Sequence, residues 1–215
     1  MSADKQDVEA FMDLARVKLT GASDAGIKAN LYEVLTEFFR ESWSWIEDIT
    51  FSVAPGQLLY QIQPSEGQII ALAGVVDPIN TPQPATMADP GQIQLINSPN
   101  IQQGSLIFTA TVVKTVVRPN QRDDFPVIPA DTLRIYHDVV MDGLCGKMML
   151  EPNKSYSNET VGLYSQRKFK AGIVTAKLDA MRRRTIGAQN WRFPQTFRVR
   201  GQKGGISVGN NTGFI

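Results

Sequence analysis

The sequence predicts an α+β fold: a four-helix bundle with an inserted small antiparallel β-domain and an extended C-terminal arm. Apolar residues recur at spacings of three and four on both sides of residues 46–117, and within that segment they alternate with polar ones. The last 29 residues, 187–215, contain no acidic residue and no pattern that could build a core. We therefore expect this last segment to extend away from its own domain.

Residues 1–45 predict a helical hairpin, the first two helices of the bundle. An amphipathic helix covers residues 4–19, and Gly21 lies at the position where helices end. Ser23 or Asp24 caps the second helix. Its apolar stripe comprises Ile27, Leu31, Val34, Leu35 and Phe38. Trp43 and Trp45 follow, and we interpret them as a packing hinge between the helical and the strand segments.

Residues 46–117 predict the β-domain. Turn signals at 55–56 and 64–67 separate strands over 46–53, 58–62 and 68–76, and the third is apolar enough to be buried on both faces. Residues 77–90 are rich in proline and indicate a long loop or an exposed insertion. Ile93 and Leu95 alternate with polar residues, and 105–117 is the clearest strand in the chain.

Residues 118–186 predict the second helical hairpin. A third helix opens at Pro129 or Asp131 and stops at Pro152. Its buried face comprises Leu133, Tyr136, Val140, Leu144 and Met148. Asn158 caps a fourth helix that ends by Gly187. One side of this helix carries Val161, Tyr164, Ala171, Val174, Leu178 and Met181.

Charge is distributed unevenly along the chain. Residues 1–151 carry ten Lys and Arg against nineteen Asp and Glu, whereas residues 152–215 carry twelve against two. This asymmetry indicates a nucleic-acid, membrane or oppositely charged protein partner, and the basic part of one copy could meet the acidic part of another. No apolar stretch is long enough to span a bilayer, so we expect no membrane partner.

The sequence contains no motif that combines a catalytic acid, base and nucleophile. His137 is the only histidine and Cys145 the only cysteine, and we expect both to be structural. Asp123 and Asp124 are adjacent acids in a loop, a pattern typical of solvated side chains rather than of a metal site. No phosphate-binding glycine loop occurs. The sequence therefore predicts no enzyme, no cofactor and no metal.

Three consecutive arginines lie at the C-terminal end of the fourth helix. Arg182, Arg183 and Arg184 suit a helix C-terminus, where the dipole favours positive charge. Three in succession exceed that need, so we expect them also to meet an acidic or phosphate surface.

A resemblance to a known family rests on the order of these elements. The segments are NLYEVLTEFFRESWSW (30–45), FPVIPADTLRIYHDVVMDGLCGKMM (125–149) and the basic helix SNETVGLYSQRKFKAGIVTAKLDAMRRR (157–184). Their order resembles the head-to-tail connectors, or neck adaptors, of short-tailed bacteriophages, the class that includes tail tubular A and gatekeeper-type proteins.

That resemblance implies a virion protein of the neck, assembled in the host cytoplasm and active in tail assembly and DNA ejection. It implies a homo-oligomeric ring of twelve copies that joins the portal to a tail nozzle or tail fibres. DNA would pass through the channel without specific binding.

The C-terminal arm would reach the portal. Arg182, Arg183 and Arg184 would meet the portal or a neighbouring subunit. Aromatic and arginine residues are the types that anchor interfaces. The arm residues expected to bind the portal are Trp191, Arg192, Phe193, Phe197, Arg198, Arg200 and Lys203. The alternative function is a nucleic-acid-binding module that uses the basic helix and arm.

Overall fold

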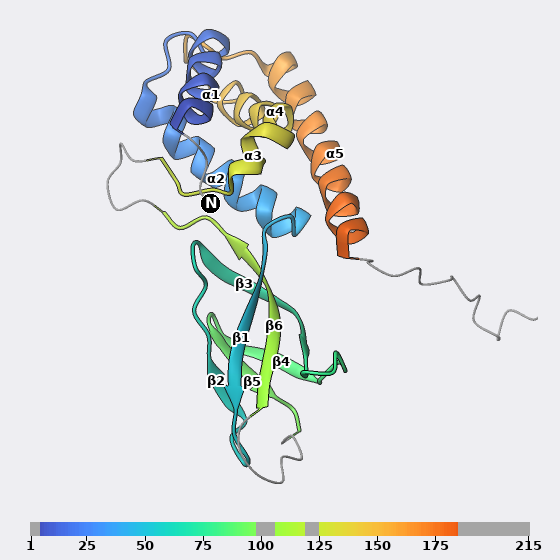
Figure 1. Cartoon of the computed structure of the whole chain (residues 1–215). Coiled ribbons are helices and arrows are strands. Elements are labelled where there is room, and N and C mark those ends of the chain that lie inside the picture. The colour runs from blue at the N-terminus through green and yellow to red at the C-terminus, as the bar shows by residue number, and fades with distance from the viewer. Residues whose placement is uncertain (1–4, 98–105, 119–124, 185–215) are drawn as a thin grey trace, which may run out of the picture. The chain divides into compact units, whose positions relative to one another are not determined.

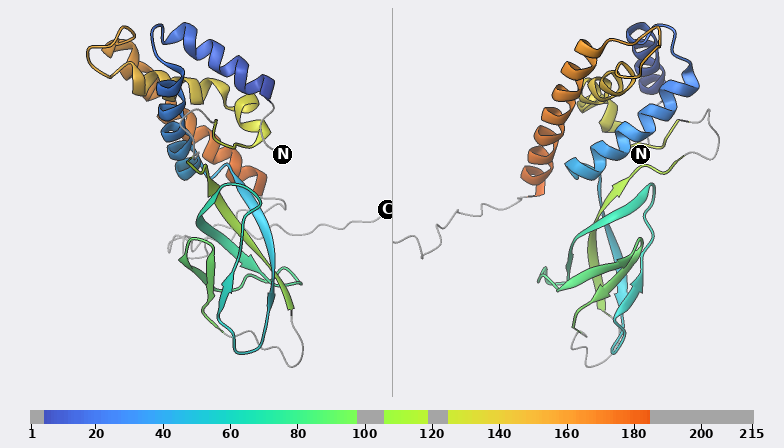
Figure 2. Two further views of the ribbon diagram at one scale, coloured as in Figure 1. Left: turned by 90° about the vertical axis from the view of Figure 1, so that its left-hand side faces the viewer. Right: turned by 180° about the vertical axis from the view of Figure 1, so that it is seen from behind.

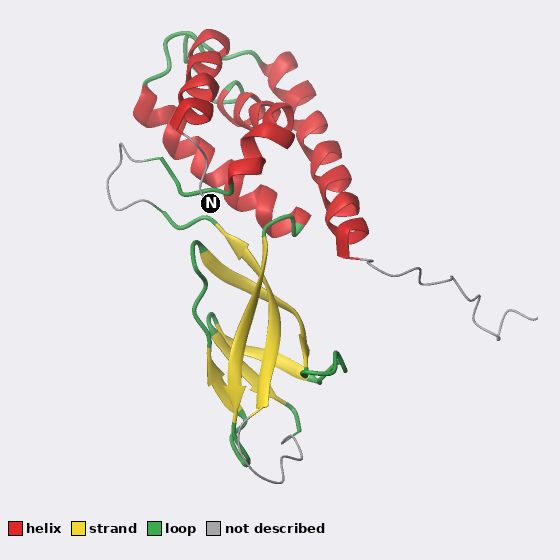
Figure 3. Cartoon of the chain, viewed as in Figure 1, coloured by secondary structure: helices red, strands yellow, loops and turns green. Residues whose placement is uncertain are grey.

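The computed structural model describes residues 5–97, 106–118 and 125–184 (Figure 1). These ranges contain five helices and two three-stranded antiparallel sheets (Figure 3). Two helices precede the six strands in the chain and three follow them. The chain divides into two units at the Arg184–Thr185 junction, and every described residue belongs to the first unit.

Helices α1 (Lys5–Lys18) and α2 (Asp24–Ser42) form where the apolar periodicity predicts them. The Ser23 hydroxyl oxygen accepts a hydrogen bond from the Gly26 amide at 3.2 Å, so Ser23 and not Asp24 is the cap. Gly21 ends the α1 segment with a φ of +92°, a conformation that glycine adopts without steric cost. The predicted stripe of α2, from Ile27 to Phe38, is buried.

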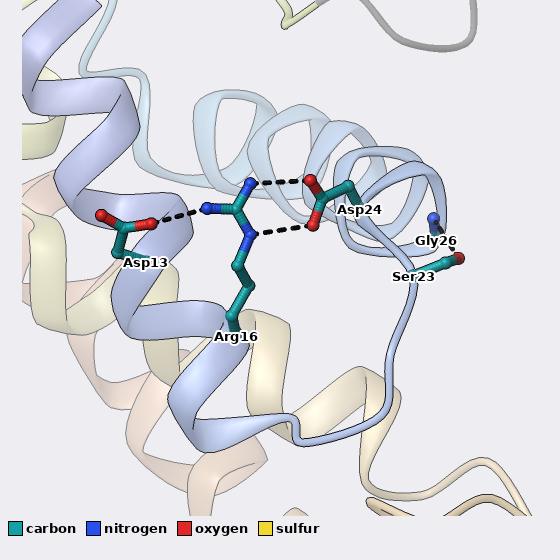
Figure 4. Close-up of polar contacts among 5 residues, drawn as sticks. All are labelled: Asp13, Arg16, Ser23, Asp24 and Gly26. Carbon is teal, nitrogen blue, oxygen red and sulfur yellow. Dashed lines mark hydrogen bonds and ion pairs between the residues drawn. The ribbon is translucent and has the colours of Figure 1, made fainter.

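Arg16 fixes the corner between these two helices (Figure 4). Its Nη1 donates to Asp13 Oδ1 at 2.6 Å, while Nε and Nη2 donate to the two carboxylate oxygens of Asp24 at 2.9 and 2.6 Å. The hydrogen bonds from Arg16 hold the pKa of Asp24 below its ordinary value. The guanidinium of Arg16 therefore forms hydrogen bonds with two carboxylates.

The strands form two sheets that share one core. The first has the order β1 (Ile46–Val53), β6 (Leu106–Thr115), β3 (Gln68–Val76), and Phe51 of β1 lies opposite Phe108 of β6. The second has the order β2 (Leu59–Gln61), β5 (Gln92–Leu95), β4 (Ala85–Asp89). Side chains of both sheets meet in the core, including Phe51, Tyr60, Ile69, Ile93 and Phe108.

One strand-level prediction is wrong, and the structure decides between the two interpretations of another segment. Strand β3 buries Ile69 and Val75 but exposes Ala73 and Gly74, because the second sheet covers only one face of the first. Of the two interpretations of the proline-rich segment 77–90, the exposed insertion agrees with the structure and the plain loop does not, since the segment contains the largely exposed strand β4, which pairs with β5. The residues of β4 do not by themselves predict a strand, because the strand depends on pairing with β5.

Trp45 joins the strand segment to the helical core. Its ring packs against Phe39 of α2 with centroids 5.2 Å apart, and it is buried in the helical core together with Val116. Lys114 lies against the same ring, with its Nζ 4.7 Å from the centroid. The Lys114 ammonium also donates to Glu47 Oε2 at 2.8 Å. At this junction a buried tryptophan ring therefore packs between the two segments, with a part-buried ion pair beside it.

The predicted third helix is two helices. Helix α3 (Ala130–Ile135) ends at Tyr136, whose φ of −112° and ψ of 20° lie outside the helical range, and α4 (His137–Met148) starts directly after it. No glycine or proline marks this break. The Tyr136 ring packs on Phe38 of α2 with centroids 5.2 Å apart, a tertiary contact at the break that local sequence does not encode.

Helix α5 (Glu159–Arg184) completes the described chain. The Asn158 side-chain oxygen accepts a hydrogen bond from the Val161 amide at 3.1 Å, which confirms Asn158 as the cap. Helix α4 lies between α1 and α5 and packs against both (Figures 1 and 2).

The predicted four-helix bundle with an inserted small antiparallel β-domain is therefore wrong. The described residues form five helices and two sheets, because the third helix breaks at Tyr136 and the strands divide into two layers. Only the mixed α+β class agrees with the structure. The division into 1–45, 46–117, 118–186 and 187–215 stays a prediction.

Candidate functional site

The predicted site residues fall mostly beyond the described chain. Trp191, Arg192, Phe193, Phe197, Arg198, Arg200 and Lys203 lie outside the described residues. The Arg182 side chain is exposed on the last turns of α5, and its Nη1 lies 3.8 Å from Asp179 Oδ1. Arg183 and Arg184 belong to the final turn of that helix, and their side chains lie outside the described part. Helix α5 is therefore where a site can be built from the described residues.

The inner face of α5 is part of the helical core. Phe169, Ile173 and Ala176 are buried there. Small residues let α4 come close: a Cβ on Gly146 of α4 would lie 2.8 Å from the backbone nitrogen of Gln166. The backbones of the two helices are thus almost in contact.

The outer face of α5 is also apolar, but it is exposed. Tyr164, Val174 and Leu178 have exposed fractions of 61, 58 and 49%. Together with Arg167, Ala171 and Met181 they follow alternating spacings of three and four along the helix, the repeat typical of a helix that packs against a second helix. The fourth-helix side singled out from the sequence is this outer face, and Tyr164, Val174 and Leu178 on it are exposed.

Cations border the outer face. Lys168 lies 3.4 Å from Asp142 of α4, and Lys170 donates to Glu37 and Glu41 of α2. The hydrogen bond with Glu37 raises the pKa of Lys170, which keeps this ammonium charged. Arg167 and Lys177 form no ion pair with another described residue. These two cations are available to a partner.

The predicted structural roles of His137 and Cys145 agree with their surroundings. The His137 ring packs edge-on against Phe11, with centroids 5.4 Å apart. Cys145 is buried, and desolvation raises the pKa of its thiol, which disfavours the reactive thiolate. Asp123 and Asp124 lie outside the described residues.

Two surface hollows lined by described residues lack a catalytic set. One of about 290 Å³ lies beside the junction, between Trp45, Asp131, Ile135 and Ala180. Another of about 370 Å³ lies along α2, where Glu33 pairs with Lys147. Among the described residues, no three His, Cys, Asp or Glu side chains gather as a metal site would require. No described helix combines the length and apolarity needed to cross a bilayer.

Neither known protein families nor curated proteins match this sequence. The outer face of α5 is the largest run of exposed apolar side chains on this helix. Its signal was present in the sequence, because small residues mark the opposite side of the helix: Gly162, Ser165, Gly172, Ala176 and Ala180. Two apolar stripes on one helix predict two partners.

Proposed function

We propose that this protein is a non-catalytic structural adaptor that works as a ring of identical copies, in the neck of a bacteriophage particle. The ring joins the portal to the tail nozzle or fibres and extends the DNA channel. The observation that carries the proposal is the exposed apolar outer face of α5, since soluble proteins leave an extended apolar surface mainly where a partner binds. A ring supplies that partner from a second copy of the chain.

The neck assignment rests on the order of sequence elements and on the basic last helix, which resemble neck adaptors. The bundle architecture that the resemblance implied is not the one observed, so the fold adds no support to it. The aromatic and basic composition of residues 187–215 suits an arm that binds the portal. A set of twelve arms on one ring would bind multivalently, so each contact can be weak.

Nucleic-acid binding by α5 is less favoured. A DNA-binding helix needs free cations for phosphates. Lys168 and Lys170 are instead engaged by carboxylates of α4 and α2. If α5 bound a phosphate backbone, the exposed apolar side chains of its outer face would remain in contact with water. A protein surface satisfies both the apolar row and the cations.

The test is assembly with and without the portal protein of the same particle. The full chain should form a closed ring, either alone or on the portal, as measured by native mass spectrometry and cryo-microscopy. A chain ending at Thr185 should keep its fold by circular dichroism and lose portal docking. The proposal fails if the full chain stays monomeric in the presence of portal rings. Salt-sensitive DNA binding without any assembly would favour the nucleic-acid module instead.

A further inference from the structure

A second α5 is a poor partner for the outer face of α5. Lys168 and Lys170 flank this face, but carboxylates of α4 and α2 already pair with them, so the positive charge left on it is that of Arg167 and Lys177. Lys177 follows Lys170 by seven residues and extends the same flank, while Arg167 lies within the apolar row itself. Two copies of this face would bring like charges together, which is destabilising. The partner surface must therefore be acidic and must differ from α5.

The outer face of α1 has these properties. Ala10, Asp13 and Val17 follow each other at spacings of three and four and are exposed, Val17 to 73%. Glu9 lies beside this row and is exposed. These side chains are short, so another helix can approach closely.

Charge on this face is negative in spite of Arg16. The single guanidinium of Arg16 binds both Asp13 and Asp24 (Figure 4), and Lys28 adds a second cation near Asp24, so this group leaves no net charge. Glu9 supplies the negative charge of this face, because it forms no ion pair with another described residue. An apolar row with acidic neighbours complements an apolar row with basic neighbours.

The two faces cannot meet within one chain. Helix α4 packs against both α1 and α5 and separates them (Figures 1 and 2). The outer faces of α1 and α5 are therefore turned away from each other, on opposite sides of the helical layer. Contact between them requires a second copy.

We infer that the outer face of α5 in one copy binds the outer face of α1 in the next copy, head to tail. The inference rests on the proposed ring and names the contact that builds it. Because the contact joins two different faces, a dimer still has one free α1 face and one free α5 face. Further copies can therefore add at both ends until the ring closes. Arg167 and Lys177 bind the acidic face, while Tyr164, Val174 and Leu178 pack on Ala10 and Val17.

The experiment uses two full-length charge variants. The basic-face variant is Arg167→Glu with Lys177→Glu, and the acidic-face variant is Glu9→Lys with Asp13→Lys. All four side chains are exposed, so both variants should keep the circular dichroism spectrum and thermal unfolding of the parent protein. Sedimentation velocity and native mass spectrometry then measure assembly, with portal present if the parent requires it.

Each variant alone should need a concentration about tenfold or more above that of the parent to assemble. An equimolar mixture should assemble as the parent does, with the variants alternating. In the mixture each reversed α5 meets a reversed α1, and each unchanged α5 meets an unchanged α1.

The outcomes separate this contact from the ring itself. Normal assembly of the acidic-face variant overturns the α1 contact and leaves the ring proposal standing, and so does failure of the mixture to assemble. A monomeric parent, with portal present, overturns both. Loss of DNA binding by the basic-face variant, with unchanged assembly, assigns the cations to nucleic acid and overturns the contact.

Discussion

The inner and outer faces of α5 have similar apolar residues but different surroundings. Phe169 on the inner face is 3% exposed, whereas Val174 on the outer face, five residues later, is 58% exposed. Helices α4 and α2 of the same chain pack against the inner face, whereas Tyr164, Val174 and Leu178 on the outer face stay exposed. Apolarity alone therefore does not distinguish a core from an interface, and the two faces should respond differently to mutation.

Removing the largest inner side chain should have the largest effect. Phe169→Ala should lower the free energy of unfolding by about 3–5 kcal/mol, because it leaves a cavity between α5 and its neighbours. The matched outer variant, Val174→Ala, should change it by about 0.5 kcal/mol or less. Urea unfolding of the monomer measures both values. Similar losses in the two variants would mean that the outer face is covered within the chain.

Loss of the ion pair of Lys114 should lower the free energy of unfolding more than loss of the charge of Lys177, which has no ion pair with a described residue. Glu47→Gln removes the ion-pair partner of the buried Lys114 and should lower the free energy of unfolding by about 1–3 kcal/mol. Lys177→Gln on α5 should change it by about 0.5 kcal/mol or less. Chemical unfolding of both variants provides the comparison. Equal stability of the two would show that the Glu47 contact contributes little.

A larger side chain should lower the free energy of unfolding at the contact between α4 and α5 but not on the outer face of α5. Gly146→Ala places a Cβ against the α5 backbone and should lower the free energy of unfolding by about 1–2 kcal/mol, since overpacking outweighs the gain in helix propensity. Ala171→Leu adds more atoms to the outer face and should leave it within about 0.5 kcal/mol. Thermal and urea unfolding test both. A stabilised Gly146→Ala would show that α4 and α5 can separate freely.

Truncation of the outer face should weaken association instead of folding. Leu178→Ala should weaken the contact between copies by about 1 kcal/mol, because exposed apolar side chains gain their contacts only in the complex. Its free energy of unfolding, measured on the monomer, should match that of the parent. Sedimentation velocity over a concentration series measures the association. Unchanged assembly would remove Leu178 from the interface.

Acid should weaken the internal ion pair at a defined pH. Burial alone raises the pKa of Glu47, but hydrogen bonds from Lys114 and Ser65 and the charge of Lys114 together hold it below its ordinary value of 4.5. The stability that Glu47 contributes is therefore fully present above about pH 4.5 and is lost as the pH falls through the lower folded-state pKa. Urea unfolding at several pH values should show this loss in the parent and not in Glu47→Gln.

Local chemistry made several parts of the fold predictable. Ser23 and Asn158 cap helices because their side-chain oxygens accept hydrogen bonds from free amide groups. The central strand β6 was clear from its β-branched residues. The break at Tyr136 was not predictable, since its ring contact with Phe38 comes from a distant part of the chain. The division into two sheets likewise depends on pairing between distant strands.

The sequence by itself determined the positions of the caps, the apolar stripes of the helices and the uneven distribution of charge. These properties depend on neighbours within a few residues. Only the tertiary structure decided which stripe of α5 is buried, because burial depends on what another element covers. The glycines of α4 let α5 approach with its small-residue side, and the larger side chains of Tyr164, Val174 and Leu178 are left outside.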